Sequence, residues 1–134
     1  MKLHNHLQRN QMDCGPSCLC TISHFYGRDI GIEIIRNSTE LGKEGVNLFG
    51  ISNAAEKIGF RTISVELSFE KLINEAPLPC IIHWEQNHFV VVTPNSTLKK
   101  IEVADPAHGI IKYTKQEFCS KWLNTADDVL GKLF

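Results

Sequence analysis

The sequence predicts an α+β fold in which helices come first and an antiparallel sheet follows. Apolar residues recur at helical spacing between residues 14 and 59. From residue 60 onward, the apolar runs are rich in β-branched and aromatic residues and are separated by polar turns. The chain has 134 residues, of which 43% are hydrophobic, so it is long enough to bury one real core. We therefore expect residues 1–134 to form a single domain.

The first helix is expected to begin at Cys14, where apolar residues start to recur every three or four positions. Asp13 is a candidate N-cap, and Pro16 falls in the first turn, where proline is tolerated. Gly27 can end the helix, because glycine readily adopts the left-handed conformation that follows many helices. The pattern therefore predicts a helix over residues 14–26.

Two more helices are predicted in residues 30–38 and 47–59, the second with Asn47 as its cap and Gly59 as its stop. The apolar pattern then changes to the period of strands. Strands are predicted in five runs, which are residues 60–67, 80–85, 88–94, 98–105 and 109–114.

Shorter elements connect these strands and complete the chain. Residues 68–76 are expected to form a short helix, and residues 86–87 a tight polar turn between two strands. Thr114 and Glu117 have the spacing of a capping box, in which each side chain binds the backbone N–H of the other residue. They predict a last helix that runs to about Trp122.

The composition narrows the class of protein. The net charge is −1, with basic and acidic residues interspersed, so no basic surface for nucleic acid is indicated. The N-terminus lacks the apolar core of a signal peptide, and no stretch approaches the roughly 18 apolar residues of a membrane span. There are five cysteines, an odd number that favours free thiols in a reducing compartment. We expect a soluble domain on the cytosolic side.

Three of the cysteines, Cys14, Cys18 and Cys20, are clustered near the N-terminus. They could be metal ligands, but Cys14 and Cys18 are separated by three residues, and no CxxC or close pair of histidines follows to complete a zinc site. Cys18 and Cys20 are better explained as small buried hydrophobic residues, and the same holds for Cys80 and Cys119. We expect no metal or cofactor.

Cys14 differs from the other cysteines because it lies where the first helix begins. The free backbone N–H groups and the positive end of the helix dipole stabilise a thiolate there, and the thiolate is the form that attacks a carbonyl. Most cysteines at such positions are structural, so a catalytic role requires a base elsewhere in the chain. Cys14 is therefore the candidate nucleophile.

His88 is the candidate base. It opens the strongly apolar strand "HFVVV", where an imidazole needs a polar partner. A structural histidine with a satisfied hydrogen bond is the alternative interpretation. His83 and His108 are rivals, but the strand pattern around His83 also fits the solvent face, and His108 falls in a loop.

Asp105 ends a predicted strand and comes immediately before Pro106. Asp-Pro pairs very often form turns, which is one interpretation of this residue. A carboxylate beside His88 would instead hold the imidazole in the tautomer that catalysis needs. The order of cysteine, histidine and aspartate along the chain is compatible with such a triad.

The stretches "QRNQMDCGPSCL", "NHFVVV" and "DPAHG" together resemble the papain-like cysteine peptidase domain of bacteriocin-processing ABC transporters. These peptidases cut leader peptides behind a double glycine. The resemblance covers nearly the whole chain and implies a papain-like fold. It implies that Cys14 is the nucleophile, that His88 is the general base, and that Asp105 orients the histidine. It also selects Gln8, six residues before the cysteine, as the oxyanion-hole donor in preference to Gln11.

The resemblance implies a cysteine endopeptidase that removes leaders from bacteriocin-like precursors after Gly-Gly, coupled to export. Its partners would be a precursor with an amphipathic leader helix, and the membrane and ATPase domains of an ABC transporter at the cytoplasmic side of the bacterial membrane. The leader helix would bind an apolar groove that the sequence does not locate. A narrow cleft would select glycine, and Trp84 is a candidate for its wall, although core packing explains this residue better.

Two other functions fit the same residues. One is a non-catalytic module that binds leader peptides for a transporter, and the other is a papain-like thiol amidohydrolase with another substrate. Family members usually continue into a membrane-spanning region and an ATPase, whereas this sequence ends at "VLGKLF". We therefore expect either the N-terminal domain of a longer transporter or a stand-alone relative.

Overall fold

The computed structural model describes residues 3–9, 13–38, 48–85, 88–122 and 128–133. The helices are α1 (Cys14–Phe25), α2 (Ile32–Ser38), α3 (Leu48–Lys57), α4 (Phe69–Asn74) and α5 (Lys115–Trp122). The strands are β1 (Arg61–Glu66), β2 (Cys80–Trp84), β3 (His88–Val92), β4 (Lys100–Asp105), β5 (Gly109–Thr114) and β6 (Asp128–Leu133).

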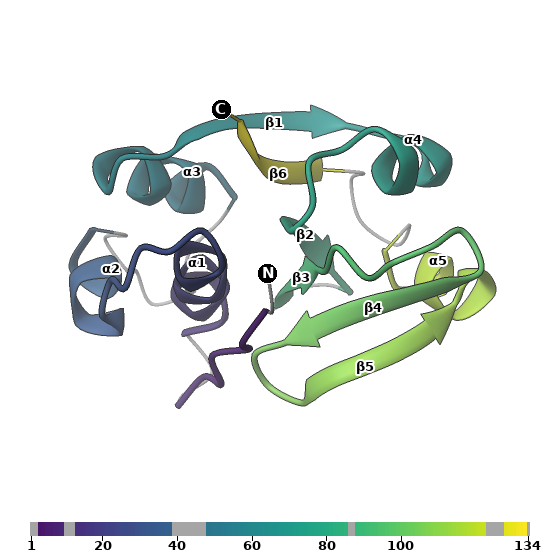
Figure 1. The fold of residues 1–134 in the computed structure, drawn as a ribbon, viewed down its shortest axis with the longest axis horizontal. Helices are drawn as coiled ribbons and strands as arrows, with labels where there is room; N and C mark the ends of the chain where they lie inside the picture. The colour runs from purple at the N-terminus through teal and green to yellow at the C-terminus, as the bar shows by residue number, and fades with distance from the viewer. Residues whose placement is uncertain (1–2, 10–12, 39–47, 86–87, 123–127, 134) are drawn as a thin grey trace.

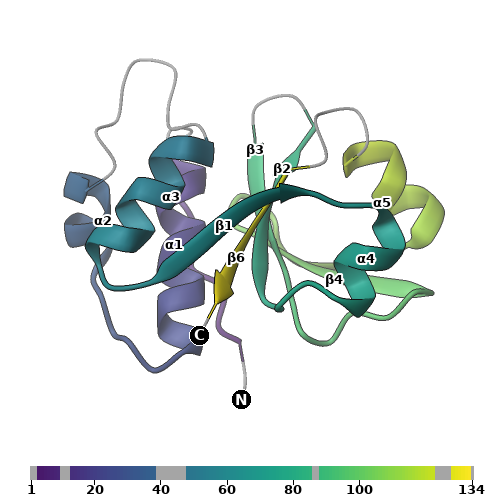
Figure 2. The same ribbon diagram turned by 90° about the horizontal axis from the view of Figure 1, so that it is seen from above.

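The strands form one antiparallel sheet with the order β1-β6-β2-β3-β4-β5. Helices α1, α2 and α3 lie together on one side of β2 and β3, and α4 and α5 lie on the other side (Figures 1 and 2). The predicted α+β arrangement, with helices first and an antiparallel sheet second, is confirmed.

Strand β6 was not predicted, because the expected elements ended near Trp122. It pairs with β1 along its whole length and with β2 through three residues, so it separates these two strands in the sheet. Its sequence contains Gly131, which weakens a strand pattern. The pairing also joins residues far apart in the chain, which local periodicity does not detect.

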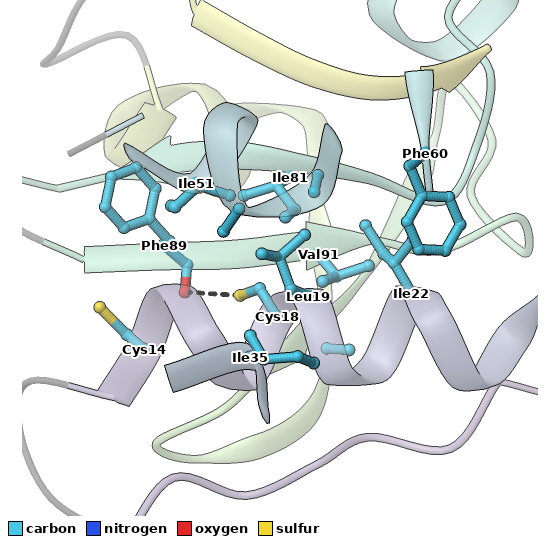
Figure 3. Packing of buried hydrophobic residues seen from close by; sticks show 13 residues of the cluster. Cys14, Cys18, Leu19, Ile22, Ile35, Ile51, Phe60, Ile81, Phe89 and Val91 are labelled. Atoms are coloured by element: carbon cyan, nitrogen blue, oxygen red, sulfur yellow. Dashed lines mark hydrogen bonds between the residues drawn. The ribbon is translucent and has the colours of Figure 1, made fainter. Parts of the chain in front are cut away.

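The central strands are covered on both faces, so they are apolar without alternation. Phe89 and Val91 of β3 belong to the core cluster beneath α1, α2 and α3 (Figure 3). Val90 and Val92 belong to a second cluster, which contains Phe118 and other residues of α4 and α5. The run "HFVVV" is therefore a strand between two cores.

Helix α1 packs against β3 through residues such as Leu19 and Ile22, which are 2% and 5% exposed. The thiol of Cys18 is buried here and donates to the carbonyl oxygen of Phe89 at 3.3 Å (Figure 3). Cys18 and Cys80 are buried, as expected, whereas Cys20 and Cys119 are only partly buried.

The end signals of the helices were predicted with one error. Gly27 and Gly59 follow α1 and α3 with φ values of +81° and +100°, which confirms both predicted stops. The capping box of α5 is also confirmed, because Thr114 N–H donates to Glu117 at 2.8 Å and Glu117 N–H donates to the Thr114 hydroxyl at 3.2 Å. The predicted cap at Asn47 and the turn at residues 86–87 lie outside the described residues.

The error concerns Asp13, whose side chain makes no capping hydrogen bond with α1. Both of its carboxylate oxygens instead accept from the guanidinium of Arg36 in α2, at 3.1 Å and 2.5 Å. The Asp13 side chain is only 2% exposed, so the carboxylate depends on this partner. The pair fixes α2 against the residue that precedes Cys14.

The first prediction concerns this pair. Arg36→Ala should lower the melting temperature by about 5 °C or more, because it leaves a buried carboxylate without its partner. Thermal unfolding followed by circular dichroism would measure the change. Glu33→Ala is the matched control, since Glu33 binds the same guanidinium at 2.7 Å but is 76% exposed. Its removal should shift the melting temperature by about 1 °C or less, and equal shifts for both variants would contradict the prediction.

Candidate active site

The three predicted triad residues lie at the ends of three elements. Cys14 is the first residue of α1, His88 is the first residue of β3, and Asp105 is the last residue of β4. Helix α1 packs on β3, and β3 pairs with β4. These contacts bring together side chains that are 74 and 17 residues apart in sequence.

His88 and Asp105 form the central contact of the site. The Nε2 atom of His88 lies 2.7 Å from Oδ1 of Asp105. An ionised carboxylate can only accept, so the proton of this hydrogen bond belongs to Nε2. The Nδ1 atom is then the ring nitrogen that remains for Cys14, which is among the groups that raise the pKa of this histidine.

Asp105 also forms the turn that was considered as its alternative role. Its Oδ1 accepts the backbone N–H of Ala107 at 2.8 Å, and its Oδ2 lies 3.2 Å from Nδ1 of His108. The side chain is 4% exposed. The turn therefore holds the carboxylate beside the His88 ring, and the role of Asp105 in orienting that ring stays a prediction.

The pKa values of His88 and Asp105 are shifted in opposite directions. Burial of the His88 ring lowers its pKa, but hydrogen bonds to Asp105 and Cys14, together with their charges, raise the pKa to about 9. Burial raises the pKa of Asp105, but hydrogen bonds to His88 and the Ala107 N–H and the charge of His88 bring it down to about 2. At neutral pH the site therefore contains an imidazolium between a carboxylate and a cysteine.

Gln8 lies next to this pair in the extended N-terminal segment. Its backbone N–H donates to the carbonyl oxygen of Pro106 at 2.8 Å, and Asn5 Nδ2 donates to the carbonyl oxygen of Asp105 at 2.9 Å. The His6 N–H donates to Thr21 of α1 at 2.9 Å, so the segment joins α1 to the β4–β5 turn. Gln11 lies outside the described residues, so the choice of Gln8 over Gln11 stays a prediction.

The rival histidines occupy different positions. The His83 ring stacks on Phe89, with ring centroids 4.9 Å apart and planes at 18°, and it is partly buried. His108 is 70% exposed but contacts the same carboxylate as His88. Sequence reasoning did not predict the contacts that His108 and Asn5 make with Asp105, because both depend on the fold of the β4–β5 turn.

A pocket of about 540 Å³ opens beside His88 and is also lined by Gln8, Asp105 and Trp84. Trp84 is 2% exposed and packs against Tyr113 and Phe118, so the expected core packing is confirmed. Trp84 nevertheless lines part of the pocket. Within the described residues, no group of three or more histidine, cysteine, aspartate or glutamate side chains could hold a metal ion.

The geometry of a cysteine at a helix start, a histidine and an aspartate agrees with a comparison against protein families. Residues 2–126 match the family described as Peptidase C39. The chain belongs to the peptidase C39 family. Membership assigns it to a family of cysteine peptidases, and the family recognised from the sequence is confirmed.

Relatives of this C39 family member include two bacterial transport proteins. The chain is 32% identical over 115 residues to the colicin V secretion/processing ATP-binding protein CvaB of Escherichia coli, covering 86% of this chain. It is 33% identical over 120 residues to the lactococcin-G-processing and transport ATP-binding protein LagD of Lactococcus lactis subsp. lactis, again covering 86% of this chain. The chain spans only 16% and 17% of the length of these two relatives.

Solved structures of C39 peptidases have the same fold. A double glycine motif protease from an AMS/PCAT transporter, crystallised with a leader peptide, has a TM-score of 0.90 and 28% identity and covers 98% of this chain and 91% of its own. The peptidase domain of Streptococcus ComA, a bi-functional ABC transporter, has a TM-score of 0.85 and 27% identity and covers 96% of this chain and 98% of its own. The predicted fold class is therefore confirmed. None of the helices in the described part of this C39 chain has the length and apolar character of a membrane crossing.

The second prediction concerns the pKa of His88 in this C39 site. Asp105→Asn should lower that pKa below about 9, because asparagine can keep the turn bond to Ala107 but carries no charge. An NMR titration of the His88 ring would measure it. His108→Ala is the control, since it removes only the exposed partner of Asp105 and should leave the His88 titration nearly unchanged.

The same shift predicts how stability depends on pH. The pKa of His88 is raised above its ordinary value of 6.5, so its pairing stabilises the fold fully below pH 6.5 and is lost as the pH rises through about 9. Wild type should therefore lose more stability across this interval than Asp105→Asn. Identical His88 titrations in the two proteins would show that Asp105 does not raise this pKa.

Proposed function

We propose that this chain is a cysteine endopeptidase that removes the leader from bacteriocin-like precursor peptides after a Gly-Gly motif, coupled to export. The observation that carries the proposal is the joint position of Cys14, His88 and Asp105, with a 2.7 Å contact in the histidine–aspartate pair. The similarity to a double glycine motif protease crystallised with a leader peptide supports the substrate class.

In the proposed reaction, the Cys14 thiolate attacks the carbonyl carbon of the second glycine. The imidazolium of His88 stabilises the thiolate and then gives its Nδ1 proton to the departing amine as the C–N bond breaks. The leader remains on the sulfur as a thioester. His88, now neutral, takes a proton from water, whose oxygen attacks the thioester carbon, and the free thiol and the leader carboxylate are formed.

The developing negative charge on the carbonyl oxygen requires donors. The backbone N–H of Cys14 can donate to this oxygen, because the first N–H groups of a helix have no partner inside the helix. We assign the second donor to the side-chain amide of Gln8, whose backbone is bound to Pro106 beside the Asp105 turn. This position supports Gln8 as part of the oxyanion hole.

The wider context belongs to the same proposal. We infer that the chain is the peptidase domain of an ABC exporter, fused or acting in trans, at the cytoplasmic side of a bacterial membrane. The support is that relatives such as CvaB are described as secretion/processing ATP-binding proteins. Its partners would be the precursor peptide and the membrane and ATPase domains of the exporter.

The third prediction tests the nucleophile. Cys14→Ala should abolish cleavage of a double-glycine leader peptide, because no thiolate remains to form the thioester. Cys18→Ala is the matched control, as Cys18 lies one turn further along α1 with its thiol bound to the Phe89 carbonyl. It should retain cleavage, although its melting temperature should fall through loss of a buried sulfur.

Peptide cleavage measured by mass spectrometry would separate these variants. Binding of the leader peptide to Cys14→Ala, measured by calorimetry, distinguishes a catalytic defect from a folding defect. Cleavage by Cys14→Ala at the wild-type rate would contradict the assignment. Leader binding by wild type without any cleavage would instead indicate a non-catalytic module.

The fourth prediction tests the oxyanion hole. Gln8→Ala should lower kcat by about 10²–10³, the usual effect of removing one preorganised donor. Gln11→Ala should have a much smaller effect. Steady-state kinetics on one leader peptide would compare them, and an equal or larger loss at Gln11 would mean that the donor is wrongly assigned.

A further inference from the structure

The pocket beside His88 lies on the side of the sheet opposite to α1. Ile111 and Tyr113 of β5 line it, and they share a face of the sheet with Val103 and Ile101, their partners on β4. That face carries the core cluster of α4 and α5, whereas Cys14 belongs to the cluster of α1. Cys14 is not among the described residues that line the pocket.

The position of the pocket determines which half of a substrate reaches it. In the proposed reaction the leader side of the substrate becomes bonded to the Cys14 sulfur. The amine on the cargo side must lie against His88, because His88 gives it the proton. A pocket that touches His88, but not Cys14, therefore lies on the cargo side of the cleaved bond.

The walls of this pocket indicate the side chain that it accepts. Its apolar and aromatic lining residues are Trp84, Ala107, Ile111 and Tyr113. Its charged groups are engaged with one another, since Glu85 binds Lys121 at 2.9 Å and Asp105 contacts both His88 and His108. A charged substrate side chain would therefore find no uncompensated partner there, while an apolar one would bury its surface.

One wall is held in a fixed conformation. Glu85 has a φ of +52°, which is uncommon for a residue other than glycine. Its backbone N–H donates to the Lys121 carbonyl oxygen at 3.0 Å, in addition to the ion pair between the two side chains. These two contacts join the end of β2 to α5 and hold this wall of the pocket against the helix.

We propose that this pocket is the subsite for the first residue of the cargo, the residue that follows the cleaved bond, and that it prefers an uncharged side chain with an apolar body. This inference rests on the proposed peptidase function. It adds a contribution of the cargo to recognition, beside that of the leader.

Two peptides with the same leader and Gly-Gly test the subsite, one with leucine and one with aspartate after the glycines. Wild type should cleave the leucine peptide with a kcat/KM about tenfold higher. Hydrolysis of the acyl-enzyme, measured in single turnovers, should be equal for both peptides, because both leave the same leader thioester. Any difference in kcat/KM between the two peptides must therefore arise in the steps up to departure of the amine.

A matched pair of variants on β5 locates the effect. Ile111 lines the pocket, whereas Ile110 points to the other face of the sheet and is 48% exposed. Ile111→Ala should lower kcat/KM for the leucine peptide by about fivefold and change that for the aspartate peptide little. Ile110→Ala should change neither value, and circular dichroism should show that both variants are folded.

The outcomes separate this inference from the proposed function. Cleavage of both peptides by wild type with equal kcat/KM would overturn the subsite alone, whether or not the variants fold. Equal losses on both peptides in Ile111→Ala, or a slower hydrolysis of its acyl-enzyme, would place the pocket on the leader side and overturn the inference. Failure of wild type to cleave either peptide would overturn the peptidase function, and the subsite with it.

Discussion

The contact between His88 Nε2 and Asp105 Oδ1, at 2.7 Å, is the interaction on which the organisation of the site depends. It requires β3 and β4 to be neighbours, because His88 opens one strand and Asp105 ends the other. It also requires the turn after Asp105, whose Ala107 N–H binds the same carboxylate oxygen. The N-terminal segment binds this turn through the Asn5 side chain and the Gln8 backbone, which donate to the carbonyl oxygens of Asp105 and Pro106. One buried carboxylate thus connects the sheet, the turn and the segment that carries the proposed oxyanion donor.

The sheet holds the site residues in position because helices cover both of its faces. The core beneath α1 fixes the start of that helix, and therefore Cys14, relative to β3. The core beneath α5 fixes the opposite face, where the pocket lies beside His88. A histidine at the first position of β3 meets both environments, the thiol on one side and the pocket on the other. The proposed reaction needs this geometry, because the leader half stays on the Cys14 sulfur while the amine of the cargo half departs beside His88.

Sequence reasoning succeeded where the signal is local. The start of α1 at Cys14 and the capping box of Thr114 and Glu117 involve neighbouring residues, so their spacing predicts them. The pairing of Asp13 with Arg36 was not predicted, since the two residues are 23 positions apart and α2 brings them together. Strand β6 was missed for the same reason, because its partners β1 and β2 lie far away in the chain. The joint position of Cys14, His88 and Asp105 was expected from their order and from the family resemblance, whereas the contact of His108 with Asp105 gave no signal in the sequence.

The electrostatics of the site change during the proposed reaction in the direction that each step needs. Before attack, the hydrogen bonds and charges of Asp105 and Cys14 keep the pKa of His88 at about 9, so the ring is protonated at neutral pH and can serve as an acid. In the thioester the sulfur carries no charge, so one of the causes that raise this pKa has disappeared. The ring has given its proton to the amine and must now take one from water. A lower pKa keeps the ring neutral at neutral pH, so that it can act as this base. Asp105 stays ionised throughout, because its own pKa is about 2, and it keeps Nε2 protonated so that Nδ1 is free to accept. A single histidine can therefore act first as an acid and then as a base, because the negative charge on the Cys14 sulfur is lost when the thioester forms.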